Sequence, residues 1–176
     1  MKIAILTDSG SGMNQKESSE WGIYYLPLQI VCQEAQYLDG ISIELQELYE
    51  LLRKGEQMTT SMPPIALIDS TLDQIKADGY DTIICVPITS GLSSTASMIG
   101  ATAKEKGLNL YIVDCFSTCY LQCYLAQCAK RLADQGLDAE TIVARLQASI
   151  ASSNTLIIPD DLQHLKKGGR LTPMAA

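Results

Sequence analysis

Short, continuously apolar segments alternate with longer stretches of helical periodicity along this chain, and no other feature restricts its fold as strongly. Residues 2–7, 82–88 and 108–113 are apolar runs of strand length. A run without polar alternation is typical of a strand that is buried on both faces. The sequence therefore predicts an α/β fold with a mostly parallel sheet covered by helices on both faces.

Helices are expected where apolar residues recur every three to four positions and capping or breaking residues mark the ends. Extended pieces are expected at 24–32 and 36–38, a loop at 59–63, and a final apolar stretch at 155–158. The predicted helices cover residues 14–22, 45–54, 64–77, 93–106, 119–134 and 138–150.

Composition excludes several classes of protein. With 47% hydrophobic and 19% charged residues, the 176-residue chain is too apolar to be disordered. The net charge of −7 argues against a nucleic-acid partner, because phosphate backbones need a basic surface. No apolar run is long enough for stable membrane insertion, and the short apolar N-terminus is not a signal peptide. We therefore expect a cytoplasmic protein, with six reduced cysteines and no metal site.

Hydroxyl-bearing side chains are concentrated in the loops where a ligand is expected. Ligands of parallel sheets bind outside the carboxyl ends of the strands, which here are the loops 7–13, 88–95 and 114–118. The loop at 59–63 joins them if it folds over the same edge. These serines and threonines either cap helix ends, or converge on a carboxylate or phosphate group near a helix N-terminus.

The helix predicted at 93–106 is rich in small residues. Small side chains permit close packing of a helix on a sheet, or they leave room for a thin apolar ligand beside the helix. The second alternative, combined with the hydroxyl loops, describes a ligand with an anionic head and an apolar tail. Established phosphate and hydrolase motifs are not matched, because Gln15 replaces the last glycine of a dinucleotide fingerprint and no nucleophile elbow is present.

Five motifs follow one another along the chain. They are Thr7-Asp8-Ser9, Thr60-Ser61-Met62-Pro63, Ser90-Gly91-Leu92-Ser93-Ser94-Thr95, Val113-Asp114 and Leu165-Lys166-Lys167-Gly168-Gly169-Arg170-Leu171. They occur in the order found in the DegV family, which the sequence resembles over its whole length. The resemblance implies a bacterial fatty-acid-binding protein that is not itself an enzyme. It also implies a dihydroxyacetone-kinase-like fatty acid kinase as partner, which phosphorylates the bound carboxylate to an acyl phosphate.

The resemblance also implies binding residues for the carboxylate of a long-chain fatty acid. Thr60 matches the family's Thr-Ser-Gln-Pro threonine, and Ser93 matches the second serine of its Ser-Gly-Leu-Ser loop. Ser61 and Ser94 are further candidates for the carboxylate. Arg170 matches the arginine of the Gly-Gly-Arg motif and is expected near the head group or on a partner-docking surface. No catalytic residue, cofactor or metal is implied.

The chain departs from the family pattern at several positions. Met62 stands in place of the usual glutamine, Ser94 in place of a glycine, and Ala96 in place of a frequent aromatic residue. The change at Ala96 is expected to widen the tail channel.

The second difference from the family is length, because family members continue into a further domain. We expect residues 1–153 to form a DegV-like α/β domain and 154–176 to open a truncated second domain. An apolar face of the helix at 93–106 should then be exposed.

Two other functions stay open on the residues alone. The chain could be an enzyme acting on a small anionic metabolite through the same loops, with Asp8 or Asp114 as its acid or base. It could also be an incomplete domain without binding activity of its own.

Overall fold

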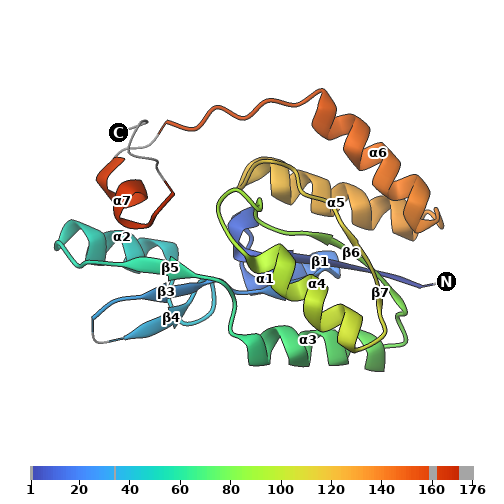
Figure 1. Ribbon diagram of the computed structural model, residues 1–176, viewed down its shortest axis with the longest axis horizontal. Coiled ribbons are helices and arrows are strands. Elements are labelled where there is room, and N and C mark those ends of the chain that lie inside the picture. Colours follow the sequence, from blue (N-terminus) through green and yellow to red (C-terminus); the bar gives the residue numbers. More distant parts are fainter. Residues whose placement is uncertain (1, 34, 159–161, 171–176) are drawn as a thin grey trace.

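Two sheets form the scaffold of this computed structural model, which describes residues 2–33, 35–158 and 162–170 (Figure 1). The strands are β1 (Ile3–Asp8), β2 (Tyr24–Leu26), β3 (Gln29–Val31), β4 (Gln36–Leu38), β5 (Thr59–Ser61), β6 (Thr82–Val86) and β7 (Asn109–Ile112). The helices are η1 (Ser9–Ser11, a 3₁₀ turn), α1 (Gln15–Trp21), α2 (Leu45–Arg53), α3 (Ile65–Ala77), α4 (Thr95–Glu105), α5 (Tyr120–Asp134), α6 (Ala139–Ala151) and α7 (Leu162–Lys167).

The larger sheet is parallel throughout, with the strand order β2-β1-β6-β7. Successive side chains of a strand point to opposite faces, so the apolar runs of β1 and β6 supply both layers of the core. Ile5 and Ile84 pack with α5 and α6, whereas Leu6 and Cys85 pack with α3 and α4 on the other face. The predicted α/β fold with helices on both faces is confirmed (Figure 1).

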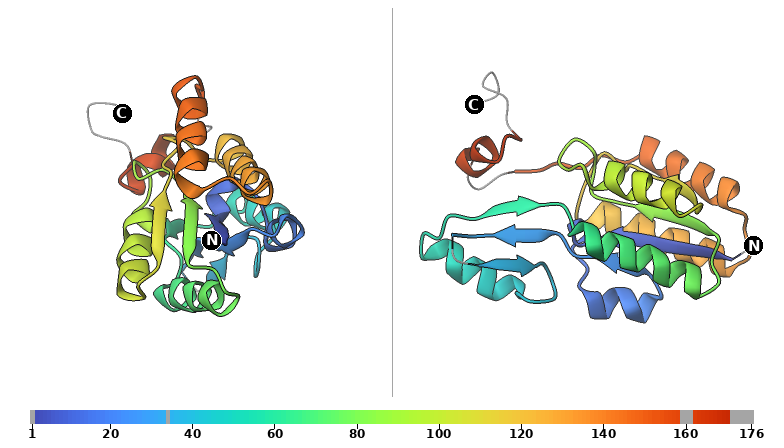
Figure 2. Two further views of the ribbon diagram at one scale, coloured as in Figure 1. Left: turned by 90° about the vertical axis from the view of Figure 1, so that its right-hand side faces the viewer. Right: turned by 60° about the horizontal axis from the view of Figure 1, so that its bottom comes forward.

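A second, smaller sheet lies beside the α/β layers with α2 alongside it (Figure 2). Its strand order is β4-β3-β5, and both pairs are antiparallel. The sequence predicted extended pieces for the first two strands but a loop at 59–63. That prediction was wrong at residues 59–61, because β5 pairs with β3 and places Thr60 directly opposite Ile30.

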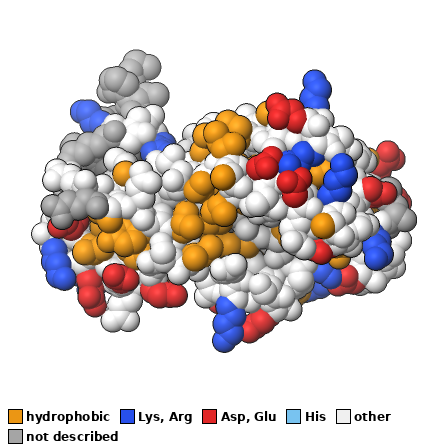
Figure 3. Space-filling view, turned by 90° about the horizontal axis from the view of Figure 1, so that it is seen from below, with side chains coloured by type: hydrophobic (Ala, Val, Ile, Leu, Met, Phe, Trp, Pro, Cys, Tyr) orange, Lys and Arg blue, Asp and Glu red, His pale blue; other side chains and the backbone are white. Residues whose placement is uncertain are grey.

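The expectation of an exposed apolar face along the helix at 93–106 was wrong. The apolar side of α4, with Ala96, Ile99 and Ala103, is buried, and the helix packs against β7 and α3. Its small residues therefore serve close packing within the chain. The exposed large hydrophobic side chains of the described residues lie outside α4, among them Leu45 and Ile65. Hydrophobic side chains of all sizes gather near the middle of the face seen from below (Figure 3).

The chain leaves the α/β layers after α6. Residues 153–158 form no regular element, and Leu156 and Ile158 are each 93% exposed. Residues 159–161 and 171–176 of the predicted second-domain segment, 154–176, lie outside the described residues, while α7 falls within it. Among the described helices, none is both long enough and apolar enough to cross a membrane.

Because β6 is a central strand, removing side-chain volume there should unfold the chain readily. Ile84→Ala is expected to lower the free energy of unfolding by about 2–5 kcal/mol, since Ile84 is fully buried. The matched variant Ile112→Ala, on neighbouring β7 where the side chain is 39% exposed, should cost about 1 kcal/mol or less. Urea titration measures both, and equal losses would contradict this placement of the core.

Candidate functional site

The loops that follow β1, β6 and β7 meet at one edge of the parallel sheet, as the sequence predicted. The Thr89 amide donates to the Ser117 carbonyl oxygen over 3.3 Å, which joins the loops after β6 and β7. The Thr118 hydroxyl donates to the Gly10 carbonyl oxygen over 2.7 Å, which joins the loops after β7 and β1. The hydroxyl-rich edge is therefore a connected structure.

Asp8 is the buried centre of this edge. Its Oδ1 accepts hydrogen bonds from the Gly10 amide and from Gln122 Nε2, each over 2.9 Å, and its Oδ2 accepts one from the Ile88 amide over 2.8 Å. Burial raises the pKa of Asp8 from 3.8 to about 6, and these three hydrogen bonds oppose the rise. Asp8 is 0% exposed, so it is a structural group beneath the edge.

Asp114 holds the outer side of the loop 88–95, which follows β6. Its Oδ2 accepts hydrogen bonds from the Ser90 amide over 3.0 Å and from the Ser90 hydroxyl over 2.6 Å, and its Oδ1 accepts one from the Phe116 amide. Partial burial opposes ionisation, but the bonds from Ser90 and Phe116 prevail and lower the pKa of Asp114 below its usual value. The loop 88–95 is thus fixed by one carboxylate on each side.

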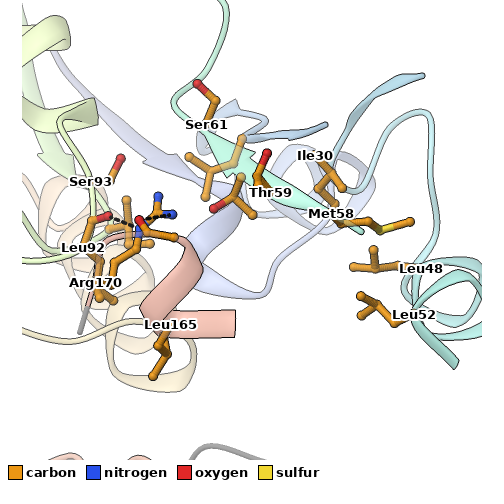
Figure 4. A pocket seen from close by; sticks show the side chains of 14 residues that line it. Ile30, Leu48, Leu52, Met58, Thr59, Ser61, Leu92, Ser93, Leu165 and Arg170 are labelled. Atoms are coloured by element: carbon orange, nitrogen blue, oxygen red, sulfur yellow. Dashed lines mark hydrogen bonds between the residues drawn. The ribbon is translucent and has the colours of Figure 1, made fainter. Parts of the chain in front are cut away.

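A cavity of about 350 Å³ opens between this loop, the small sheet and the segment after α6. Leu48 and Leu52 of α2 lie with Met58 at one end, and Ser93 lies with Arg170 at the other (Figure 4). The cavity therefore has an apolar end and a polar end. It is lined by Leu28, Ile30, Leu48, Leu52, Met58, Thr59, Thr60, Ser61, Ile88, Leu92, Ser93, Leu165, Gly168 and Arg170.

The structure brings together most of the site residues expected from the sequence. Thr60, Ser61, Ser93 and Arg170 all line the cavity, and Ser94 does not. Thr60 shares the face of the small sheet that carries Ile30, because residues directly opposite each other on paired strands point to the same side.

The two serines at the start of α4 differ in their contacts. Ser93 Oγ lies 2.8 Å from Thr95 Oγ1, while the exposed Ser94 directs its hydroxyl to the sulfur of Met62 over 3.8 Å. Ser94 and Met62, two positions at which the sequence departs from the family pattern, are thus neighbours.

Arg170 ties the C-terminal described segment to the loop after β6. Its Nε donates to the Leu92 carbonyl oxygen over 3.3 Å, and its Nη1 donates to the Gly168 carbonyl oxygen over 3.2 Å (Figure 4). Among the described lining residues it is the charged one, and it lies at the same end as Ser93.

The apolar end of the cavity was not predicted. The sequence placed a possible tail channel beside the helix at 93–106, yet beyond Ser93 no residue of that stretch lines the cavity. Ala96 is buried inside the fold, so its expected effect on a tail channel was wrong. A signal was present in α2, whose leucines recur at helical spacing although none of its residues is fully buried.

The lining offers few groups for acid–base or metal chemistry. Among its described residues there is no aspartate, glutamate, histidine or cysteine. No group of three or more potential metal ligands was found in the part of the chain that the structure describes.

Comparison with known proteins gives relatives over the whole chain. A family model described as "Uncharacterised protein, DegV family" matches residues 2–176. A DegV domain-containing protein from Halalkalibacterium halodurans is 31% identical over 97% of this chain and 61% of its own length.

Among solved structures, DegV, a fatty acid binding protein from Bacillus subtilis, has a TM-score of 0.83 at 28% identity, covering 96% of this chain and 61% of its own. A fatty acid binding DegV family protein from Streptococcus agalactiae has a TM-score of 0.82 at 27% identity, with coverages of 98% and 62%. The chain thus spans about three-fifths of the length of these relatives.

The raised pKa of Asp8 predicts how stability depends on pH. The folded chain takes up a proton at Asp8 more readily than the unfolded chain, so this group favours folding increasingly as the pH falls from about 6 to about 4. Over that range, the free energy of unfolding of the wild type should rise relative to Asp8→Asn by up to about 3 kcal/mol.

Urea titrations at several pH values measure this difference. Asp114→Asn is the matched control with the opposite sign, because the lowered pKa of Asp114 contributes stability that is lost as the pH falls. Parallel pH profiles for the wild type and Asp8→Asn would contradict the prediction.

Proposed function

Because the chain belongs to the DegV family, we propose that it binds a long-chain fatty acid in this cavity, in the cytoplasm. The observation that carries the proposal is the distribution of side chains in the lining, with Leu48, Leu52 and Met58 together at one end and Ser93 and Arg170, beside Leu92 and Leu165, at the other (Figure 4). A molecule with an anionic head and an apolar tail matches this division. The names of two similar solved proteins support the choice, since both are described as fatty acid binding.

The apolar end supplies the affinity for the tail in this proposal. Each methylene transferred from water to an apolar surface contributes about 0.8 kcal/mol. The side chains of Leu48, Leu52 and Met58 would contact the part of the tail that follows the head group. A fatty acid should therefore bind more tightly than a short carboxylate with the same head.

The polar end supplies neutral donors for the carboxylate. Hydroxyls of Thr60, Ser61 and Ser93, which line the cavity, would donate to its oxygens, and hydrogen bonds to an ionised group are stronger than those between neutral groups. Ser94 lies outside the lining and would have to turn from Met62 to join them. The N-terminus of α4 adds a favourable dipole for an anion. Ser94, at the N-cap position of α4, makes no side-chain bond to the helix, so its hydroxyl is not used as a cap.

The alternative of an enzyme acting on a small anionic metabolite receives less support. Asp8, its main candidate acid or base, is fully buried and accepts hydrogen bonds on both oxygens. Both oxygens of Asp114 already accept hydrogen bonds, from the Ser90 hydroxyl and the Phe116 amide. The described lining offers no carboxylate, which favours a carrier over a catalyst.

Removing the head-group hydroxyls should weaken binding. Ser93→Ala also removes the contacts of Ser93 Oγ with Thr95, so urea titration checks that this variant is folded. Thr60→Val and Ser93→Ala are each expected to raise the dissociation constant for palmitate about tenfold, since each removes one donor to a charged group. Ser97→Ala is the matched control, because Ser97 is exposed on α4 away from the cavity. Isothermal titration at pH 7.5 measures the affinities, and native mass spectrometry identifies any lipid that co-purifies.

Three results of this experiment are informative. Selective loss in the two site variants supports the proposed head-group site. Equal affinities for all variants would place the carboxylate elsewhere. No uptake by the wild type would favour an incomplete domain without binding activity of its own.

A kinase partner is the second part of the proposal. Thr60 and Ser61 are exposed, so a head group held there would be reachable by another protein. In the reaction, a carboxylate oxygen would take the γ-phosphoryl group of ATP, giving an acyl phosphate and ADP. Arg170 would contact either the head group or this partner.

Incubation of the loaded chain with a dihydroxyacetone-kinase-like fatty acid kinase, Mg²⁺ and ATP should yield acyl phosphate, trapped by hydroxylamine and measured by mass spectrometry. Arg170→Ala distinguishes the two places proposed for this residue. Loss of fatty-acid binding places Arg170 at the head group, and loss of transfer alone places it at the partner. Absence of transfer with the wild type would contradict the kinase proposal.

A further inference from the structure

We propose that Asp8 is a positioning residue for the ligand site, which locks the loop carrying Ser93 when ionised and releases it when protonated. The inference rests on the proposed function for its effect on binding. The hydrogen bond between the loop and Asp8 is a feature of the described fold and does not depend on the proposed function.

One hydrogen bond connects the buried carboxylate to the ligand loop. Asp8 lies at the end of β1, and its Oδ2 accepts the Ile88 amide hydrogen over 2.8 Å. Ile88 lines the cavity, and the same loop continues to Leu92 and Ser93, which also line it. The bond from Ile88 is therefore one of the contacts that position Ser93, together with the bonds from Ser90 to Asp114 and from the Ser93 amide to the Thr89 carbonyl oxygen.

The two oxygens of Asp8 are not equivalent. Oδ1 accepts two hydrogen bonds, from Gly10 and Gln122, whereas Oδ2 accepts only the bond from Ile88. A neutral carboxyl group has one carbonyl oxygen that accepts freely and one hydroxyl that donates. Protonation of Oδ2 keeps two bonds and loses one, while protonation of Oδ1 disturbs two. Protonation therefore breaks the hydrogen bond from the Ile88 amide to Oδ2 at the least cost, and Ile88 belongs to the ligand loop.

Gln122 shows that this network is incompletely satisfied. Its Nε2 lies within hydrogen-bond distance of Asp8 Oδ1, Thr7 Oγ1 and Val86 O, while its buried Oε1 has no partner in the described structure. An unpaired buried acceptor costs free energy. The amide nitrogen of Gln122 thus donates to Oδ1, which still accepts when the proton is on Oδ2, and the oxygen of Gln122 is left without a partner in the described structure.

Among the groups around Asp8, Asp8 itself is the one that changes charge between pH 7.5 and pH 5. Burial raises the pKa values of Cys85, Cys115 and Tyr25, so these three are neutral near pH 6. Asp39 is the other carboxylate whose charge acts on Asp8, and it raises the pKa of Asp8 further. With a pKa of about 6, Asp8 is mostly ionised at pH 7.5 and mostly protonated at pH 5.

Amide hydrogen exchange at Ile88 tests the lock directly. In the wild type, protection of the Ile88 amide should fall at least tenfold between pH 7.5 and pH 5, after correction for the intrinsic exchange rate. Asp8→Asn should show the low protection at both pH values. The Val113 amide, which donates to the Cys85 carbonyl oxygen over 2.8 Å, is the internal reference and should not respond. Because the wild-type series needs no variant, an Asn variant that fails to fold does not affect this test.

Palmitate titration tests the effect on the site. At pH 7.5, Asp8→Asn should bind about tenfold more weakly than the wild type, and the difference should close by pH 5. Titration of the fatty acid itself is common to both proteins and cancels in the comparison. Asp114→Asn is the matched control, since it removes the other carboxylate from the loop and should keep the pH step.

The outcomes separate this inference from the proposed function. Unchanged protection of Ile88 between pH 7.5 and pH 5 overturns the lock, whatever binds. Equal palmitate affinities of the wild type and Asp8→Asn at both pH values overturn the positioning role and leave fatty-acid binding intact. If the wild type binds no palmitate, the proposed function is wrong and the effect on binding falls with it.

Discussion

The buried carboxylate of Asp8 is the interaction on which the functional edge depends. Three N–H groups from separate parts of the chain converge on it, from the turn after β1, the loop after β6 and helix α5. Only a carboxylate has enough acceptor capacity for all three, because an amide side chain offers one oxygen. Gly10 is needed beside it, since a Cβ at that position would stand 2.8 Å from Asp8 Oδ1 and from Ile88 Cβ. The edge is thus built around a charge that the fold hides from solvent.

This location of charge explains how an acidic chain can offer a site for an anion. The net charge is −7, yet the described cavity lining carries no carboxylate and one guanidinium group. Charges separated by more than about 10 Å of solvent are largely screened at physiological salt, so the immediate lining matters more than the total. Asp8 and Asp114 act on the loop from beneath and from the side, through hydrogen bonds to its backbone. Neutral hydroxyls of Thr60, Ser61 and Ser93 are left in the described cavity lining.

The sequence predicted those parts of the fold that depend on local periodicity. Unbroken apolar runs identified β1 and β6 because both faces of these strands are buried, and the edge where their loops meet followed from parallel topology. The three-residue strands of the small sheet carry no such pattern, and β5 in particular is exposed throughout. Its pairing with β3 is a long-range contact, so residues 59–61 looked like a loop. Thr60 was found through a family resemblance, and its place opposite Ile30 required the structure.

The apolar end of the cavity shows why a ligand site is harder to predict than a core. Small residues in α4 suggested room for a tail, but β7 and α3 fill that room. In α2, by contrast, Leu48, Leu51 and Leu52 are only partly buried and Leu45 is 64% exposed. Apolar side chains that the chain itself does not cover are the ones available to a ligand. In this fold α4 is packed inside the chain, and in the proposed function the partly exposed side chains of α2 would supply the surface for the tail.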